Sequence, residues 1–217
     1  MGNLKEILRK LLRQIYEFGN FGNFKYSKPS LNNLDDKLAK YLNFKDGFFI
    51  EVGANDGYSQ SNTYYLEKIL KWQGVLIEAI PELYEKCKKQ RKKAYVYNCA
   101  LVASDYKEST IDVHFANLMS VVEGSRKIPE EQNKHIADGL KIQNLKKSYT
   151  VRVPARTLES ILDELTQPLK IDFFSLDVEG YELNVLKGLN LEKYKPAYIL
   201  VEATFFNEVN SFLKQKL

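Results

Sequence analysis

The sequence predicts an α/β fold, in which a mostly parallel sheet carries helices on both faces. Three observations lead to this prediction. Apolar, strand-like segments alternate with helical segments from residue 48 onward. A glycine-containing turn follows the first strand, and four of the strands end in acidic residues. The carboxyl ends of parallel strands lie at one edge of the sheet, where such folds bind their ligands.

The composition fits one globular domain. A chain of 217 residues with 44% hydrophobic residues can bury a single large core. The net charge of +4 is mild and the lysines are dispersed, which argues against nucleic-acid binding. The densest basic run, residues 86–93, is expected to be the solvated end of a helix. Cys87 and Cys99 fit no zinc spacing or disulfide-rich pattern, so we expect a reduced, cytoplasmic protein.

Residues 1–46 are predicted to form an N-terminal helical cap and flap. Residues 3–18 have an apolar face of leucine and isoleucine, with lysine and arginine elsewhere. This helix is expected to dock on the domain or on a second subunit, which favours a homodimer. A basic helix lying on a membrane surface is the alternative. Residues 19–30 are rich in glycine and phenylalanine and form the candidate flap, and a short helix is expected at 34–42.

Residues 47–217 are predicted to form the main domain. Strands are expected where apolar, β-prone residues cluster, at 48–53, 74–79, 94–100, 171–177 and 197–202. Helices are expected between or after them, at 62–71, 81–89, 158–165, 182–189 and 207–216. Because strands and helices alternate, the strands should be parallel, with right-handed crossovers.

An insertion interrupts this domain at about residues 105–154. Residues 110–116 and 149–154 alternate like antiparallel strands, and a helix is expected near 130–140. A long connection inside a compact domain often builds a substrate lid. We therefore expect the acceptor site to be formed by residues 117–148, together with the flap.

The turn after the first strand is suited to a ligand. Gly53 and Gly57 allow the backbone to turn sharply and to approach a bound molecule closely. The acids at the four strand ends are Glu51, Glu78, Asp177 and Glu202. A purely structural alternative is that these acids cap the helices that follow them.

The spacing of these residues favours one kind of ligand. Glu78 follows Gly57 by about 20 residues, the distance at which an acid binds a ribose hydroxyl in nucleotide-binding βαβ units. The two glycines do not form the G-x-G-x-x-G pattern of dinucleotide sites. Asp56 would repel a pyrophosphate, whereas Asp56 and Glu51 suit a ligand that carries an ammonium and a sulfonium. S-adenosylmethionine is such a ligand.

Four segments together resemble the FkbM family of S-adenosylmethionine-dependent methyltransferases. They read Glu-Val-Gly-Ala-Asn-Asp-Gly at 51–57, Leu-Ile-Glu-Ala-Ile-Pro-Glu at 76–82, Asn-Cys-Ala-Leu at 98–101 and Asp-Val-Glu-Gly-Tyr-Glu at 177–182. The resemblance extends from about residue 48 to residue 202. It implies a class I methyltransferase fold with a Rossmann-like sheet, and O-methylation of sugars, glycans or other natural products. The final strand hairpin of that class is not predicted here, so the sheet is smaller or the chain is truncated.

The resemblance also implies roles for particular residues. The glycines of the turn would line the methionine part of the cofactor and Glu78 would bind its ribose, while Ala100 and Leu101 would flank the adenine. Asn62 and Thr63, at the start of the next helix, are candidate contacts for the cofactor carboxylate. The expected cofactor contacts are Glu51, Gly53, Asn55, Gly57, Asn62, Thr63, Glu78, Ala100 and Leu101.

Asp177 is the first candidate for the base that activates the acceptor hydroxyl, and Glu179 is the second. A similarity to catechol O-methyltransferases offers an alternative, in which Asp177 and Glu202 hold a magnesium ion. His114 is expected to be structural rather than a base. Two other functions stay open, a nicotinamide-dependent oxidoreductase, which the glycine spacing disfavours, and a non-catalytic cofactor-binding module.

Overall fold

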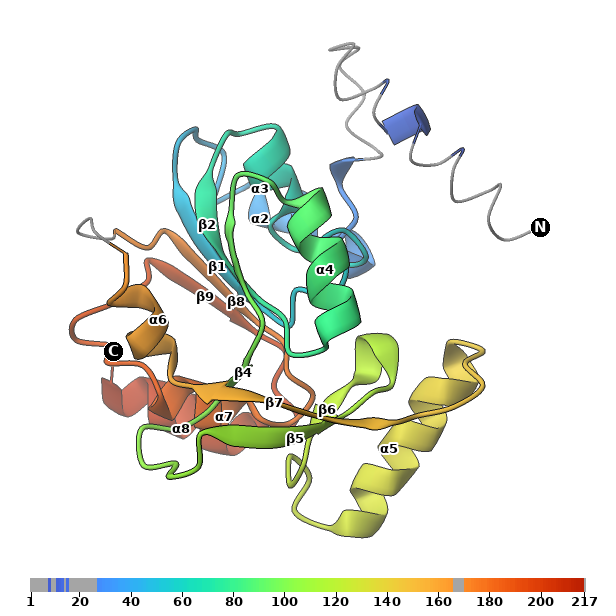
Figure 1. Ribbon diagram of the computed structural model, residues 1–217. Helices are drawn as coiled ribbons and strands as arrows, with labels where there is room; N and C mark the ends of the chain where they lie inside the picture. The colour runs from blue at the N-terminus through green and yellow to red at the C-terminus, as the bar shows by residue number, and fades with distance from the viewer. Residues whose placement is uncertain (1–7, 9–10, 14, 16–26, 166–169, 217) are drawn as a thin grey trace.

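The computed structural model describes residues 8, 11–13, 15, 27–165 and 170–216 (Figure 1). Its first sheet has five strands in the order β3-β2-β1-β8-β9, and every neighbouring pair is parallel. These strands are β1 (Phe48–Val52), β2 (Gln73–Ile77), β3 (Tyr95–Tyr97), β8 (Phe173–Leu176) and β9 (Tyr198–Val201). The predicted α/β fold with a mostly parallel sheet is confirmed.

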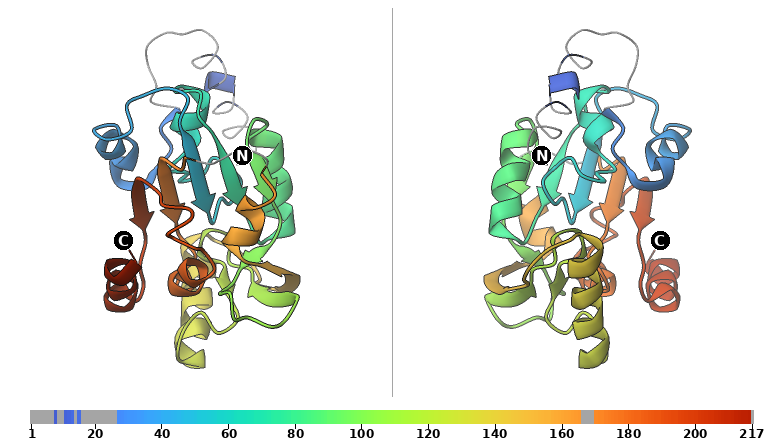
Figure 2. Two further views of the ribbon diagram at one scale, coloured as in Figure 1. Left: turned by 90° about the vertical axis from the view of Figure 1, so that its left-hand side faces the viewer. Right: turned by 90° about the vertical axis from the view of Figure 1, so that its right-hand side faces the viewer.

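Helices cover both faces of this sheet (Figure 2). They are α3 (Tyr64–Lys68), α4 (Pro81–Gln90), α6 (Leu158–Leu162), α7 (Glu182–Lys187) and α8 (Phe206–Lys216). Because side chains alternate along a strand, β1 contributes to two separate cores. Phe49 packs in a cluster with Leu66 of α3, and Ile50 in a cluster with Ile161 of α6 and Val185 of α7. Burial on both faces explains why these strands read as continuous apolar runs.

The insertion forms a second sheet with the order β4-β7-β5-β6. Its strands are β4 (Ala100–Leu101), β5 (Thr110–His114), β6 (Val121–Val122) and β7 (Thr150–Arg156). Strand β5 pairs antiparallel with β6 and β7, which confirms the pairing expected from the alternating pattern. Between the strands lie the 3₁₀ helix η3 (Asn117–Met119) and helix α5 (Pro129–Ile142), close to the predicted position. Figure 1 shows this unit beside the carboxyl ends of β1 and β2.

The prediction of one strand at residues 94–100 is wrong, because two separate strands form there. Strand β3 ends at Tyr97, and β4 begins at Ala100 as part of the second sheet. At the break, the amide Nδ2 of Asn98 donates to the carbonyls of Glu78 and Ala79, at 2.9 Å each. These bonds direct the chain out of the first sheet. The helix expected at 62–71 is also shorter, since α3 begins only at Tyr64.

The N-terminal segment is described only in part. The described residues of the predicted first helix, 8, 11–13 and 15, are helical, and Arg13 lies over the ring of Tyr58 at 4.0 Å. The 3₁₀ helix η2 (Leu31–Asn33) and helix α2 (Leu34–Leu38) follow, which shortens the helix expected at 34–42. Most of the expected flap lies outside the described residues, so its role stays a prediction.

Strand β9 forms one edge of the first sheet, and α8 follows it directly. Within residues 170–216 no strand pairs with the free side of β9, so the final hairpin of class I methyltransferases is not formed there. None of the described helices has both the length and the apolar character that a membrane span requires.

Candidate active site

A cavity of about 230 Å³ lies at the carboxyl ends of the central strands. Residues at the ends of β1, β2 and β8 and just after β9 contribute to its wall, together with the turn after β1, the second sheet, η3 and the end of α5. All four acids at the strand ends line it, namely Glu51, Glu78, Asp177 and Glu202. The cavity is therefore placed where ligands bind in parallel α/β sheets.

Most of the expected site residues line this cavity. Besides those four acids, they are Gly53, Asn55, Asn62, Ala100, Leu101 and Glu179. Gly53 has a φ of 85°, and a Cβ there would lie 2.0 Å from the carbonyl oxygen of Asp177. Glycine at this position thus lets the turn after β1 pack directly on the segment that follows β8.

Gly57 and Thr63 are not among the residues that line the cavity, and their expected role as cofactor contacts stays a prediction. A Cβ on Gly57 would lie 2.8 Å from Cγ of Arg91 and 3.0 Å from Sγ of Cys87. Gly57 is therefore required for close packing against the end of α4. The Thr63 side chain instead donates a hydrogen bond to the carboxylate of Glu51.

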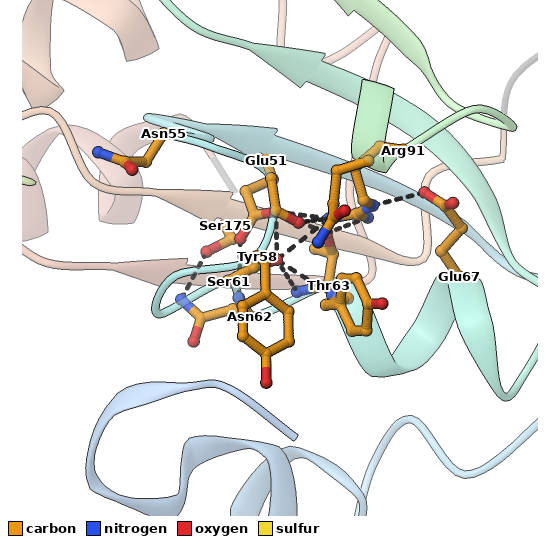
Figure 3. A network of polar contacts seen from close by, with 12 residues as sticks. Glu51, Asn55, Tyr58, Ser61, Asn62, Thr63, Glu67, Arg91 and Ser175 are labelled. Atoms are coloured by element: carbon orange, nitrogen blue, oxygen red, sulfur yellow. Dashed lines mark hydrogen bonds and ion pairs between the residues drawn. The ribbon is translucent and has the colours of Figure 1, made fainter. Parts of the chain in front are cut away.

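Arg91 is buried behind the turn and bonds to several of its groups (Figure 3). Its Nε donates to Oε2 of Glu67 at 2.6 Å, and Nη2 donates to Oγ1 of Thr63 at 2.9 Å. Its Nη1 donates to the carbonyl of Gly57 at 3.2 Å and to Oγ of Ser61 at 3.1 Å. Arg91 belongs to the basic run that we expected to be solvated, so that expectation is wrong for this residue. A buried guanidinium with several acceptors fixes the shape of the turn.

The groups around Arg91 also hold the carboxylate of Glu51 in place. Its Oε2 accepts hydrogen bonds from Ser61 Oγ at 2.8 Å and Thr63 Oγ1 at 2.6 Å, and lies 3.5 Å from Nη1 of Arg91. Its Oε1 accepts from the backbone N–H of Asn62 at 2.7 Å. Glu51 therefore holds the segment that precedes α3 and does not cap the helix itself, whose Tyr64 N–H bonds to Oγ of Ser61. Glu51 also lines the cavity.

Glu78 stabilises the other side of the turn. Its Oε2 accepts from the N–H of Asn55 at 2.7 Å, and its Oε1 accepts from the N–H of Ile80 at 2.8 Å. Burial raises the pKa of Glu78 to about 7, although these bonds oppose the shift. Asp56, in contrast, bonds to the N–H groups of Tyr58 and Ser59 within its own turn, and it does not line the cavity.

The acids after β8 and β9 accept fewer hydrogen bonds than Glu51 and Glu78 do. Oδ1 of Asp177 is buried and has no hydrogen-bond partner among the described residues. Burial, together with the negative charges of Glu202 and Glu179, raises the pKa of Asp177 to about 8. Burial and Glu202 also raise the pKa of Glu179 to about 7, against the opposing effect of Arg126. These carboxyl groups therefore exchange protons near neutral pH.

Two residues that the sequence did not indicate contact Glu179. Nη2 of Arg126 lies 3.6 Å from its Oε2, and Nε2 of His135 lies 3.3 Å from the same oxygen. Both residues belong to the insertion, within a polar stretch that carries no recognisable motif. The only indication in the sequence was the length of the insertion, because long connections in compact domains often contribute to a functional site.

The magnesium alternative finds no support in the side-chain arrangement. Asp177 and Glu202 both line the cavity, but the described residues hold no group of three or more metal-ligating side chains. His114 does not line the cavity; its ring bonds to Thr150 and pairs with Glu123 on the second sheet.

A parallel α/β sheet with an acid-lined cavity at the carboxyl ends of its strands belongs to the class of α/β folds that bind ligands at this edge. The family of the methyltransferase FkbM domain matches residues 51–217, which is most of the chain. The chain therefore belongs to the FkbM methyltransferase family.

Two solved structures are similar over part of the chain. The X-ray structure of YjhP from E. coli is 13% identical over 35% of this chain and 34% of that one, with a TM-score of 0.26. A SAM-dependent methyltransferase from Thiobacillus denitrificans, in complex with S-adenosyl-L-homocysteine, is 16% identical over 38% and 36%, also with a TM-score of 0.26. The matched part spans about a third of each of these proteins. No curated protein matches the chain.

Proposed function

We propose that this protein is an S-adenosylmethionine-dependent O-methyltransferase that acts on a hydroxyl group of a sugar, a glycan or another natural product. One observation carries the proposal: Glu51, Glu78 and Asp177, from three neighbouring parallel strands, line a single cavity. Burying a carboxylate costs free energy unless it is paired or hydrogen-bonded, so packing alone would not favour three acids around one cavity. Such groups gather at functional sites.

The residues of the cavity fit the cofactor. Each oxygen of Glu78 accepts one backbone N–H and keeps a second lone pair, which suits the hydroxyls of a ribose. Ala100 and Leu101 are buried and apolar, as the face of an adenine requires. Oδ1 of Asn62 is buried and has no hydrogen-bond partner among the described residues, so it can accept from an ammonium group.

The acids and the cavity walls have different roles in the proposed reaction. The bound cofactor supplies a methyl group on a positively charged sulfur. Glu51 places negative charge near that cation, and the cavity walls align the acceptor with it, which is largely an orientation effect. A positioned base contributes about 10²–10⁴-fold more. Asp177 and Glu179 are suited to this task because their pKa values lie near the working pH.

Methyl transfer to a panel of acceptors tests the proposal. Purified protein is incubated with S-adenosylmethionine labelled in the methyl group and with nucleotide-sugars, oligosaccharides and small polyols. We expect label in a new O-methyl group, and none with the double variant Asp177→Asn/Glu179→Gln. If S-adenosylhomocysteine binds but no hydroxyl acceptor is methylated, the protein is a cofactor-binding module and the proposal fails. The expected homodimer, cytoplasmic location and absence of nucleic-acid partners stay predictions.

A further inference from the structure

The insertion supplies a histidine and an arginine to one carboxyl group of the cavity. Glu179 lines the cavity, and its Oε2 lies 3.3 Å from Nε2 of His135 and 3.6 Å from Nη2 of Arg126. Both partners are largely buried, with 13% and 14% of their side chains exposed. Asp177, two residues earlier, has no such partners: its buried Oδ1 has no hydrogen-bond partner among the described residues.

The contact between Arg126 and His135 defines which proton the ring carries. Nη2 of Arg126 lies 3.0 Å from Nδ1 of His135. A guanidinium only donates hydrogen bonds, so Nδ1 must accept, and the proton of the neutral ring lies on Nε2. Burial, reinforced by the charge of Arg126, holds the pKa of His135 below its ordinary value. Nε2 therefore carries the proton and lies 3.3 Å from Oε2 of Glu179, although it makes no hydrogen bond to any described residue.

Packing fixes the insertion against the segment that contains Glu179. Glu179 has a φ of 55° and Gly180 a φ of 106°, so the chain makes an unusual turn there. A Cβ on Gly180 would lie 3.0 Å from the carbonyl oxygen of Ser125. Helix α5, which carries His135, is itself tied to η3 by Gln143, whose side chain bonds to the backbone of Ala116 and Leu118. The histidine is thus held in place from two sides.

We propose that His135 and Arg126 are positioning residues that place the negative charge of the Asp177–Glu179 pair on Glu179, so that Glu179 is the base and Asp177 stays protonated. This inference rests on the proposed function and reverses the order that the sequence suggested. In the reaction, the acceptor oxygen bonds to the methyl carbon and its proton passes to a carboxylate oxygen of Glu179. The broken C–S bond leaves its electron pair on the sulfur, which becomes a neutral thioether.

The charges around Glu179 agree with this division. Glu202 and Glu182 act on both carboxyl groups of this pair, and Glu51 also acts on Asp177. Glu51 and Glu202 lie at the ends of β1 and β9, and Glu182 begins α7. Arg126 and His135 face Glu179 from the insertion. Two nearby carboxyl groups that share a site titrate as a pair, and the group nearer to the donors ionises first.

Carboxyl NMR tests the assignment without cofactor or acceptor. The side-chain carbon signals of Asp177 and Glu179 are identified from Asp177→Asn and Glu179→Gln, and both are followed between pH 5 and 9. We expect Glu179 to ionise first. Arg126→Gln, which removes the positive charge, and His135→Leu, which removes the N–H, should raise its midpoint, by about one pH unit for the arginine. Arg126→Lys, which keeps the charge, and His135→Gln, which keeps an N–H, should preserve the order. If Asp177 ionises first in the unchanged protein, or if neither disruptive variant moves Glu179, the inference is wrong.

Two substitutions elsewhere in the insertion serve as controls. His114→Gln removes the other histidine, and Arg152→Gln removes an exposed arginine that pairs with Asp112. Neither residue lines the cavity, so neither change should move the titration of Glu179. A shift of equal size in either control would mean that the insertion acts through general stability, and it would overturn the inference.

Kinetics then separate the two acids. Glu179→Gln should lower kcat by about 10²–10⁴-fold. Asp177→Asn should keep kcat within about tenfold, because an amide resembles a protonated carboxyl group in shape and neutrality. The opposite pattern would make Asp177 the base and refute the inference. Since the NMR titration needs no turnover, it succeeds or fails independently of whether the protein methylates any acceptor.

Discussion

The two sides of the cavity differ in how completely their polar groups are paired. On one side, both oxygens of Glu51 accept hydrogen bonds, and Arg91 joins the surrounding groups into a buried network (Figure 3). On the other side, Oδ1 of Asp177 has no hydrogen-bond partner among the described residues, and the pKa values of Asp177 and Glu179 are raised to about 8 and about 7.

This difference separates a supporting part of the site from a reactive part. A fully satisfied buried network is rigid and holds one geometry, which suits the binding of an unchanging cofactor. Carboxyl groups with raised pKa values are costly to the folded state but are ready to exchange protons near pH 7. We therefore expect substitutions on the Arg91 side to reduce stability, and substitutions on the Asp177 side to affect proton transfer.

The largest effect is expected from Arg91→Met. The change leaves the buried carboxylate of Glu67 without its partner and removes support from Glu51, so it should destabilise the fold by about 3–5 kcal/mol. Urea unfolding followed by circular dichroism measures this loss. Lys89→Met, an exposed change at the end of the same helix, is the matched control and should stay within about 0.5 kcal/mol. Equal losses in the two variants would refute the structural role of the network.

Gly53→Ala should have the next largest effect. It combines a positive φ with a Cβ placed 2.0 Å from the backbone oxygen of Asp177, so the two strand-end segments must move apart. We expect a loss of about 1–3 kcal/mol and weaker binding of S-adenosylhomocysteine. Gly124→Ala shares the positive φ but has no described atom within 4 Å of the added Cβ, and it should leave binding unchanged. Thermal melting and calorimetry compare the two.

Asp177→Asn is expected to stabilise the protein, in contrast to both changes above. The pKa of Asp177 rises from 3.8 to about 8 on folding, so the folded state binds more protons between these values. The free energy of unfolding therefore decreases as the pH rises through this window. Asn carries no proton that titrates there, so the variant lacks this decrease. The variant should be more stable than the unchanged protein by about 0.5–2 kcal/mol at pH 8, and nearly equal to it at pH 4. Lower stability at pH 8 would show that the ionised side chain has partners.

The smallest effect is expected where the two sides are linked. Nδ2 of Asn55 donates to Oδ1 of Asn117 at 3.3 Å, which connects the turn after β1 to the insertion. Asn117 has a φ of 52°, so Asn117→Gly removes this bond without adding backbone strain. Affinity for S-adenosylhomocysteine should fall by no more than about threefold, as for one partly exposed hydrogen bond. A loss above tenfold would mean that the cofactor side depends on the insertion.

The sequence predicted the elements that depend on local pattern. Apolar runs followed by glycine or an acid located β1 and β2, and alternation located β5 and β7. It failed where distant residues decide the outcome. In the sequence, Arg91 cannot be told apart from the other charges of its basic run. Its burial depends on ion pairs with Glu67 and Glu51, which are distant in sequence. His135 and Arg126 become meaningful only when the insertion folds back onto Glu179.

The proposed activity requires a cavity that accepts S-adenosylmethionine through Glu51, Glu78 and the residues around them. Calorimetric titration of the purified protein with S-adenosylhomocysteine, with NAD as the control ligand, tests this most directly. We predict saturable heat with S-adenosylhomocysteine, none with NAD, and at least tenfold weaker binding for Glu78→Gln, since the amide can accept hydrogen bonds at only one of its two positions. Heat with NAD and none with S-adenosylhomocysteine would contradict the account.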